Sequence, residues 1–224
     1  RLKSISIRHV GATSGADQAP PRTTSDPDQQ IGMPIGFDDV SIKNTFATYG
    51  VASLYDYSQV NLNTVLKLEA PEYHVTYSQT QLLLAEAVSR GWAAGDPAAL
   101  YESAIRANME QYADYGSAAV ITPEDIQAYI DAHPYSPADA LDLINTQYWV
   151  VSFLNGAELF ANLRRSGFPD LEKNPYPGSE ITGKFIRRMP YPDSEIITNT
   201  ANLDAAIAQQ GPNDINTRVW WDTE

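Results

Sequence analysis

The sequence contains no cysteine, and this absence removes several kinds of chemistry at once. Without cysteine the chain forms no disulfide, offers no thiolate nucleophile and builds no cysteine-ligated zinc site. Histidine is also scarce, because only His9, His74 and His133 occur, and none belongs to an HExxH or comparable metal-ligand spacing. We interpret these three as unrelated surface or hydrogen-bonded histidines.

Basic residues are few, with 15 Lys and Arg against 28 Asp and Glu, which gives a formal net charge of -13. Such a field repels phosphate backbones and anionic lipid surfaces, so we expect no nucleic-acid partner. Long hydrophobic runs are also missing. The sequence therefore predicts no transmembrane helix, and residues 1–20 do not have the pattern of a signal peptide.

What the chain does contain is enough apolar sequence for one sizeable core, since 43% of its 224 residues are hydrophobic. Residues 1–75 form a loop-rich region. Partial alternation around Ile5 and Ile7 predicts a short strand within 1–10, residues 11–39 form a long loop, and residues 40–75 are irregular but aromatic. Because the chain opens on Arg1 with a strand already under way, we expect an N-terminal part, with any export signal or lipid anchor, to be missing.

Residues 76–166 have the periodicity of helices that pair as hairpins. Asp96-Pro97, Thr122-Pro123 and Ser136-Pro137 each combine an N-cap residue with proline at the first helical position, and Ser78 with Gln81 forms a plausible capping box. The expected helices cover 77–92, 97–115, 123–132, 137–154 and 157–166. Residues 167–224 are predicted to be an irregular tail that packs on these helices, with one small helix at 203–209. The predicted fold is mainly α, built from tetratricopeptide-like helical hairpins with long irregular loops.

Three stretches of the sequence resemble motifs of the SusD/RagB family. The first is TYSQTQLLLAEAVSRGW (76–92) with ALYESAIRANMEQY (99–112), which is similar to the family's central helical hairpin. The second is QYWVVSFLNGAELFANLRRSGFPDL (147–171), and the third is RRMPYPDSEIITNTANLDAAIAQQGPNDINTRVWWD (187–222). Their order and spacing carry the resemblance, although Gln79 stands where the family often has Glu and Phe160-Ala161 where a Trp is common.

The resemblance implies a non-enzymatic nutrient-binding protein, of which this chain is the C-terminal portion. It implies a lipid-anchored position on the extracellular face of the outer membrane, with contact to the membrane only through an N-terminal anchor absent from this chain. The implied partner is a SusC-like TonB-dependent transporter, and the implied ligand is an oligosaccharide or a peptide. No cofactor is implied.

Candidate ligand-binding residues lie in the aromatic part of the first region. Pyranose C–H faces pack on aromatic rings, while sugar hydroxyls bond planar amides, carboxylates or guanidinium groups. The loop residues Asn44, Phe46, Tyr49, Tyr55 and Tyr57 meet that demand. We therefore predict that they contact the ligand, and we interpret the four tryptophans, Trp92, Trp149, Trp220 and Trp221, as packing residues.

Two alternatives remain open from the sequence. Glu86 and Glu158 lie on apolar helical stretches and would suit a glycan hydrolase, unless each is buried opposite a cation such as Arg106, Arg164 or Arg165. A helical scaffold that binds only protein is the other alternative. Four aspartates of the long loop leave a structural calcium ion open without matching an EF-hand, and a solvated acidic loop is favoured: Asp26, Asp28, Asp38 and Asp39.

Overall fold

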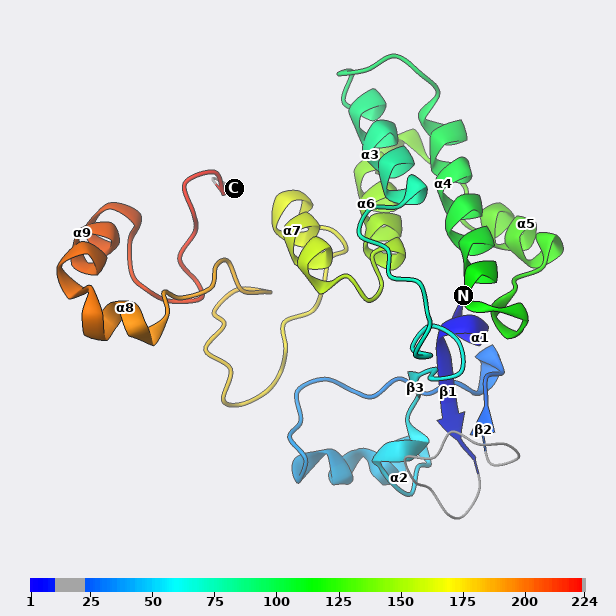
Figure 1. Ribbon diagram of the computed structural model, residues 1–224, viewed down its shortest axis with the longest axis horizontal. Helices are drawn as coiled ribbons and strands as arrows, with labels where there is room; N and C mark the ends of the chain where they lie inside the picture. The colour runs from blue at the N-terminus through cyan, green and yellow to red at the C-terminus, as the bar shows by residue number, and fades with distance from the viewer. Residues whose placement is uncertain (11–22, 223–224) are drawn as a thin grey trace.

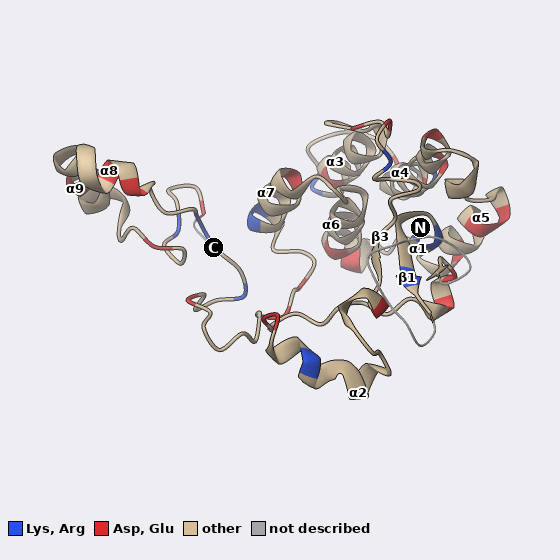
Figure 2. Cartoon of the chain, turned by 60° about the horizontal axis from the view of Figure 1, so that its bottom comes forward, with Lys and Arg blue, Asp and Glu red and all other residues tan. Residues whose placement is uncertain are grey.

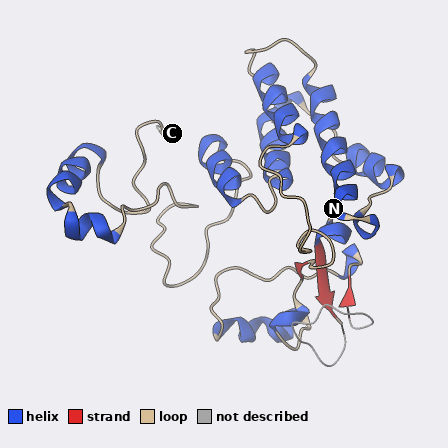
Figure 3. Cartoon of the chain, viewed as in Figure 1, coloured by secondary structure: helices blue, strands red, loops and turns tan. Residues whose placement is uncertain are grey.

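Five helices form the largest block of the molecule, as the computed structural model shows for residues 1–10 and 23–222 (Figures 1 and 3). These helices are α3 (Tyr77–Ser89), α4 (Pro97–Gln111), α5 (Pro123–Ala132), α6 (Ala140–Val151) and α7 (Gly156–Ser166). In Figure 1 α3 and α4 run side by side in opposite directions, α6 lies behind α3, and α5 lies beside α4. The expected mainly α fold of helical hairpins is confirmed.

The helix starts follow from their capping residues. Thr76 has an extended backbone, and its side chain accepts a hydrogen bond from the N–H of Gln79 in a capping box. The predicted box of Ser78 with Gln81 is wrong, because Ser78 lies inside the helix and its hydroxyl donates to the carbonyl of Ala104. The caps at Asp96 and Thr122 form as predicted.

One apolar core joins four of these helices. Each contributes residues at helical spacing, such as Leu82 from α3, Ile105 from α4, Ile130 from α5 and Ile144 from α6. All four side chains are buried. These buried residues recur with the 3.6-residue period of an α-helix, which is also visible in the sequence. The same pattern therefore predicts both the helices and the face of each helix that packs in the core.

A small sheet lies below the helices in Figure 1, in the order β2-β1-β3, with both pairs antiparallel. The strands are β1 (Ser6–His9), β2 (Thr23–Thr24) and β3 (Gln59–Val60). The predicted strand begins later than expected, because Leu2–Ile5 form one helical turn, α1. Of the predicted loop at 11–39, residues 11–22 lie outside the described residues.

Between β2 and β3 the chain forms short helical turns instead of a regular element. These are η1 (Pro27–Gln29), η2 (Ser41–Thr45), α2 (Phe46–Tyr49) and η3 (Leu54–Asp56). A small separate core of Ile42, Val51 and Tyr57 holds them together. Of the predicted ligand-binding residues, Asn44 lies in η2, Phe46 and Tyr49 lie in α2, Tyr55 lies in η3, and Tyr57 directly follows η3.

The C-terminal segment returns to long loops with two helices, α8 (Asp193–Thr198) and α9 (Thr200–Gln210). Figure 1 shows both on the far side of α7 from the other helices. The sequence missed α8 and predicted only part of α9. The ring of Trp221 packs on the Arg164 guanidinium of α7, with 4.7 Å from the cation to the ring centroid. The division of the chain into three regions stays a prediction.

Negative charge is distributed over the helices instead of being gathered on one of them, as the red segments of Figure 2 show. None of the helices in the described ranges combines the length and the hydrophobicity needed to cross a bilayer.

Candidate functional site

The predicted ligand-binding residues lie on a short helical segment that is built around one buried ring. The side chain of Tyr57 is 0% exposed, and its hydroxyl lies 2.6 Å from Thr45 Oγ1. The rings of Phe46 and Tyr49 contact this ring, with centroids 6.3 Å and 5.9 Å away. The buried ring of Tyr57 therefore packs against the other two rings and is not accessible to a ligand.

The remaining predicted residues reach the surface. Tyr49 and Tyr55 are 42% and 43% exposed, Asn44 is exposed, and Phe46 is half-buried. We call these four residues the aromatic surface. Four of the five predicted residues thus lie at the surface, and the fifth is in the core because the aromatic composition of a loop does not tell which ring the loop folds over.

The turn that carries Tyr55 is held rigidly by hydrogen bonds. Ser53 Oγ accepts from the N–H of Tyr55 at 3.2 Å, and Asp56 Oδ2 accepts from the N–H groups of Ala52 and Ser53 at 2.7 Å and 3.0 Å. Asp56 is itself buried. Upstream, Gly50 ends α2 with φ of 64°, a left-handed conformation that glycine adopts without strain. The aromatic surface is therefore largely pre-formed.

Its chemistry suits a ligand with both apolar faces and hydroxyl groups. Exposed tyrosine rings pack against C–H faces, while the phenol hydroxyls and the amide of Asn44 can donate and accept hydrogen bonds. None of the four carries a formal charge at neutral pH. The surface therefore favours a neutral polar ligand over an ionic one.

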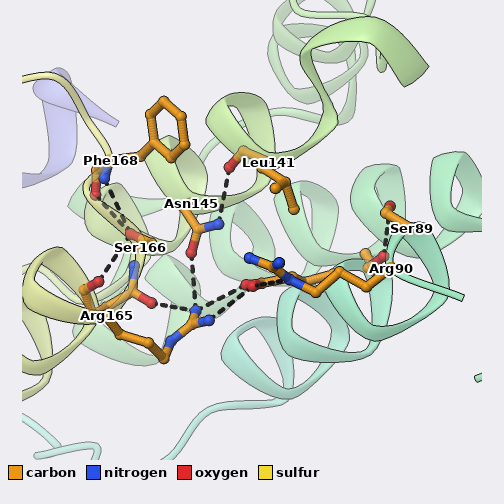
Figure 4. A network of polar contacts seen from close by, with 10 residues as sticks. Ser89, Arg90, Leu141, Asn145, Arg165, Ser166 and Phe168 are labelled. Atoms are coloured by element: carbon orange, nitrogen blue, oxygen red, sulfur yellow. Dashed lines mark hydrogen bonds and ion pairs between the residues drawn. The ribbon is translucent and has the colours of Figure 1, made fainter. Parts of the chain in front are cut away.

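Glu86, one of the two carboxylates considered for hydrolysis, forms ion pairs with Arg90 and Arg165, which are both labelled in Figure 4. Arg165 donates to both of its oxygens at 2.8 Å, and Arg90 Nε donates to Oε1 at 2.8 Å. Arg165 also donates to Asn145 Oδ1 and Asn162 Oδ1. The interpretation of Glu86 as a buried group opposite a cation is confirmed.

The charges around Glu86 decide its protonation. Burial alone would raise the pKa of this carboxyl, but the hydrogen bonds and charges of Arg165 and Arg90 outweigh burial and hold its pKa below the ordinary value. A glycosidase acid needs a raised pKa. Glu86 is therefore suited to a structural ion pair and not to proton donation.

Glu158 has a different partner from the predicted cation. Its Oε1 accepts a hydrogen bond from the hydroxyl of Tyr148 at 2.5 Å. Burial, together with this carboxylate, raises the pKa of Tyr148. The two glutamates thus have different hydrogen-bond partners, Arg165 and Arg90 for Glu86 and Tyr148 for Glu158.

No group of three or more His, Asp or Glu side chains within residues 1–10 and 23–222 is arranged to hold a metal ion. Asp26 instead caps η1, and Asp38 accepts hydrogen bonds from Ser41, which hold the pKa of Asp38 below its ordinary value. His9 is buried in β1, and neither of its ring nitrogens has a hydrogen-bond partner within residues 1–10 and 23–222, in contrast to the surface or hydrogen-bonded position expected for it.

Two tryptophans interpreted as packing residues are instead largely exposed. Trp92 follows Gly91, whose φ of 73° turns the chain away from α3, and Trp220 lies near the C-terminal end. Helical spacing brought Trp92 into the expected helix, but α3 ends at Ser89. Gly91 is the residue in the sequence that could have indicated that the helix ends before Trp92.

The sequence matches a family model, SusD-like_2, described as "Starch-binding associating with outer membrane", over residues 24–192. Among solved structures, the fold is similar to a chitin-binding protein at 36% identity and a TM-score of 0.69, covering 78% of this chain and 38% of the other. A search of curated proteins finds no match.

Two further structures are similar. A SusD homologue from Bacteroides fragilis NCTC 9343 is 28% identical with a TM-score of 0.69, covering 88% of this chain and 44% of its own. A chitin-binding SusD homologue from Flavobacterium johnsoniae has the same fold at 23% identity and a TM-score of 0.64, with coverage of 88% and 44%. The chain therefore spans less than half the length of these relatives.

Proposed function

This chain belongs to the SusD-like family, and from that premise we propose that it captures an oligosaccharide at the cell surface without catalysing a reaction. The family description names starch binding and association with the outer membrane. Similar structures carry the name of chitin-binding proteins. A neutral glycan is accordingly the ligand class that we propose, with a peptide as the alternative class.

The observation that carries the proposal is the aromatic surface. Tyr49 and Tyr55 expose their rings, and the hydrogen bonds to Asp56 and the buried Tyr57 fix the segment that bears them. A pre-formed surface loses little conformational entropy on binding. Rings held in this way can stack on pyranose faces without a costly rearrangement.

The further steps of the proposed function concern partners. We propose that a SusC-like TonB-dependent transporter receives the glycan, and that a lipid anchor outside residues 1–224 holds the protein on the extracellular face of the outer membrane. Family membership supports both. A pull-down of the lipidated full-length protein from detergent-solubilised outer membranes, with mass spectrometry, tests the transporter, and the absence of a co-purifying barrel would contradict it.

The binding test uses calorimetric titration of the chain with maltohexaose and with chitohexaose, the soluble oligomers of starch and chitin. The double variant Tyr49→Ala/Tyr55→Ala should raise the Kd more than tenfold while leaving the Tm within about 2 °C, because both rings are partly solvated. Tyr77→Ala, at an exposed tyrosine on α3, is the matched control and should leave the Kd unchanged. Equal affinity in the double variant and the wild type would remove the aromatic surface from the function.

The enzyme alternative has a separate readout. The lowered pKa of Glu86 argues against a general acid at that position. Prolonged incubation with either hexasaccharide should release no shorter sugar. Products that disappear in Glu86→Gln or Glu158→Gln would overturn the non-enzymatic proposal.

A further inference from the structure

A shallow hollow of about 320 Å³ lies where two loops that are distant in sequence meet, and we call it the loop hollow. Residues 36–38, which precede η2, line one side, and residues from 174–179, which follow α7, line the other. The volume is at the lower end of the range for small-molecule sites, about 300–1,000 Å³. None of the residues of the aromatic surface lines the loop hollow, so it is a separate feature of the molecule.

A glycine lets the two loops approach closely. Gly36 has φ of 91°, a conformation that other residues rarely adopt, and a Cβ atom there would lie 2.5 Å from Cγ of Pro175. Gly32, on the same loop, has no such constraint, because a Cβ atom there would meet nothing within 4 Å. A residue with a side chain at position 36 would therefore push the two loops apart.

Local bonds hold the second loop in shape before any ligand binds. Asn174 Oδ1 accepts a hydrogen bond from the N–H of Tyr176 at 3.0 Å, and the carbonyl of Tyr176 accepts one from the N–H of Ser179 at 3.0 Å. Pro175 and Pro177 flank Tyr176, and each proline ring fixes its own backbone φ angle. The loop that carries Tyr176 therefore loses little conformational entropy when a ligand binds.

Two aromatic rings, one from each loop, are open to solvent at the loop hollow. Phe37 and Tyr176 are 42% and 41% exposed, close to the values for Tyr49 and Tyr55 on the aromatic surface. A ring that is partly packed on the protein and partly solvated offers a flat apolar face to a ligand. The C–H face of a pyranose ring is a suitable partner for such a surface.

Accessible polar groups lie beside these rings. Oδ1 of Asp38 accepts hydrogen bonds from Val40 and Ser41, whereas Oδ2 accepts none from the part of the chain that the structure describes. Asn174 uses Oδ1 in its own turn, and its Nδ2 donates to none of the described residues. Both side chains are exposed, so a ligand can reach them. An acceptor and a donor beside apolar ring faces suit a sugar, whose hydroxyls both donate and accept.

The charge of the lining argues against an anionic ligand. Asp38 is the charged residue among those that line the loop hollow. Hydrogen bonds from Ser41 hold the pKa of Asp38 below its ordinary value, so its carboxyl is ionised at neutral pH. This charge repels a phosphate or a carboxylate, whereas it accepts hydrogen bonds from neutral hydroxyl groups.

We propose that the loop hollow is a second carbohydrate site, which takes one or two units of a neutral sugar. The rings of Phe37 and Tyr176 pack against C–H faces of the sugar. Asp38 Oδ2 accepts a hydrogen bond from one sugar hydroxyl, and Asn174 Nδ2 donates to another. The inference rests on the proposed function for its ligand class, but not on the aromatic surface for its binding energy.

The test follows backbone amide resonances by NMR while the full chain is titrated with maltose and with diacetylchitobiose, the disaccharides of starch and chitin. One of the two sugars should shift the resonances of Asp38 and Ser179. Phe37→Ala/Tyr176→Ala should raise the Kd measured from these resonances at least fivefold, because it removes both rings from the loop hollow. Met33→Ala, at a 50% exposed side chain on the same loop, is the matched control and should leave this Kd unchanged.

A change in the backbone tests the contact between the loops without removing a group that touches the ligand. Gly36→Ala should raise the same Kd at least fivefold, since a Cβ atom at position 36 displaces Pro175. Gly32→Ala is its matched control and should leave the Kd unchanged. An unchanged Kd in either Gly36→Ala or Phe37→Ala/Tyr176→Ala would overturn the second site.

The second site and the proposed function fail in different ways. If the resonances of 44–57 shift with maltohexaose or chitohexaose while those of 36–38 and 174–179 respond to no sugar, the second site fails and the aromatic surface stands. The reverse result supports the second site and removes the aromatic surface. Tyr49→Ala/Tyr55→Ala should leave the disaccharide Kd at the loop hollow unchanged, and loss of binding there in this variant would overturn a separate site.

Discussion

The helical hairpins at 76–166 and the loop-rich region at 23–75 are stabilised in different ways. In the hairpins, fully buried apolar side chains such as Leu82 and Ile105 fill one core that joins four helices. In the loop-rich region the apolar core is small, with Ile42, Val51 and Tyr57 as its buried members. The comparison shows that one large apolar core joins the helices of the first region, whereas the second region combines a small apolar core with individual polar contacts.

Those polar contacts join positions that are distant in sequence. Thr64 Oγ1 donates to the carbonyl of Ser4 at 2.5 Å, and Ser58 Oγ donates to Gln30 Oε1 at 2.8 Å. Ser58 Oγ also accepts from the N–H of Ile31. Each contact involves one specific hydroxyl or amide, so each can be removed by one substitution.

The largest effect is expected in the helical core. Leu82 is 0% exposed, and Leu82→Ala should lower the free energy of unfolding by about 3–4 kcal/mol through lost burial and a residual cavity. Leu68→Ala is the matched control in the loop-rich region, because Leu68 is 96% exposed and should change stability by less than about 0.5 kcal/mol. Urea denaturation followed by circular dichroism measures both. If Leu82→Ala and Leu68→Ala lowered the free energy of unfolding by similar amounts, the hairpins would not depend on this core.

The next effect concerns the ion pair that crosses the hairpins. Arg165→Ala leaves the buried Glu86 carboxylate with Arg90 and should lower the free energy of unfolding by about 2–3 kcal/mol at pH 7. Because the folded pKa of Glu86 lies below its usual 4.5, this group stabilises the fold above that value. The contribution is lost as the pH falls through the folded pKa.

The difference between wild type and Arg165→Ala should therefore shrink on acidification below about pH 4.5, measured by urea denaturation at several pH values. Arg106→Ala is the control, since its guanidinium bonds the exposed side chain of Gln127. A difference that stays constant from pH 7 to pH 3 would mean that Arg165 acts by packing alone.

The contrast between the two regions also explains which parts of the structure could be predicted from the sequence. Proline after an N-cap residue and apolar spacing placed α4 and α5 within a few residues, because both signals are local. The motif at 76–92 predicted a helix, although its capping box lay at Thr76 instead of Ser78. The buried Glu86 was predicted with Arg165 among its partners, since an isolated charge on an apolar face needs a cation.

The candidate site was only partly predictable. Composition directed attention to residues 44–57, but burial of Tyr57 depends on Thr45, Ile42 and Val51 converging from both sides of α2. A cavity lined by residues from 65–79, 108–115 and 151–157 was not predicted at all, because its walls come from three segments that are separated by 28 and 35 residues of sequence. No period or motif reports such a convergence.

The smallest effect tests whether the loop-rich region depends on single polar contacts. Thr45→Val keeps the shape of the side chain but removes the oxygen that lies 2.6 Å from the Tyr57 hydroxyl, leaving that buried group unpaired. We expect the free energy of local opening to fall by about 1–2 kcal/mol. Amide hydrogen exchange should accordingly become faster in residues 42–57 and not elsewhere. Thr48→Val, at an exposed threonine one helical turn away, should leave exchange unchanged. Adding Tyr57→Phe to Thr45→Val should restore part of the loss, because it removes the unpaired hydroxyl, whereas the Ile42 carbonyl still lacks the hydrogen bond that Thr45 Oγ1 donates to it. If exchange in α3 and α4 rises by the same amount, the two regions unfold as one unit, and the polar contacts of the loops support the hairpins as well as the aromatic surface.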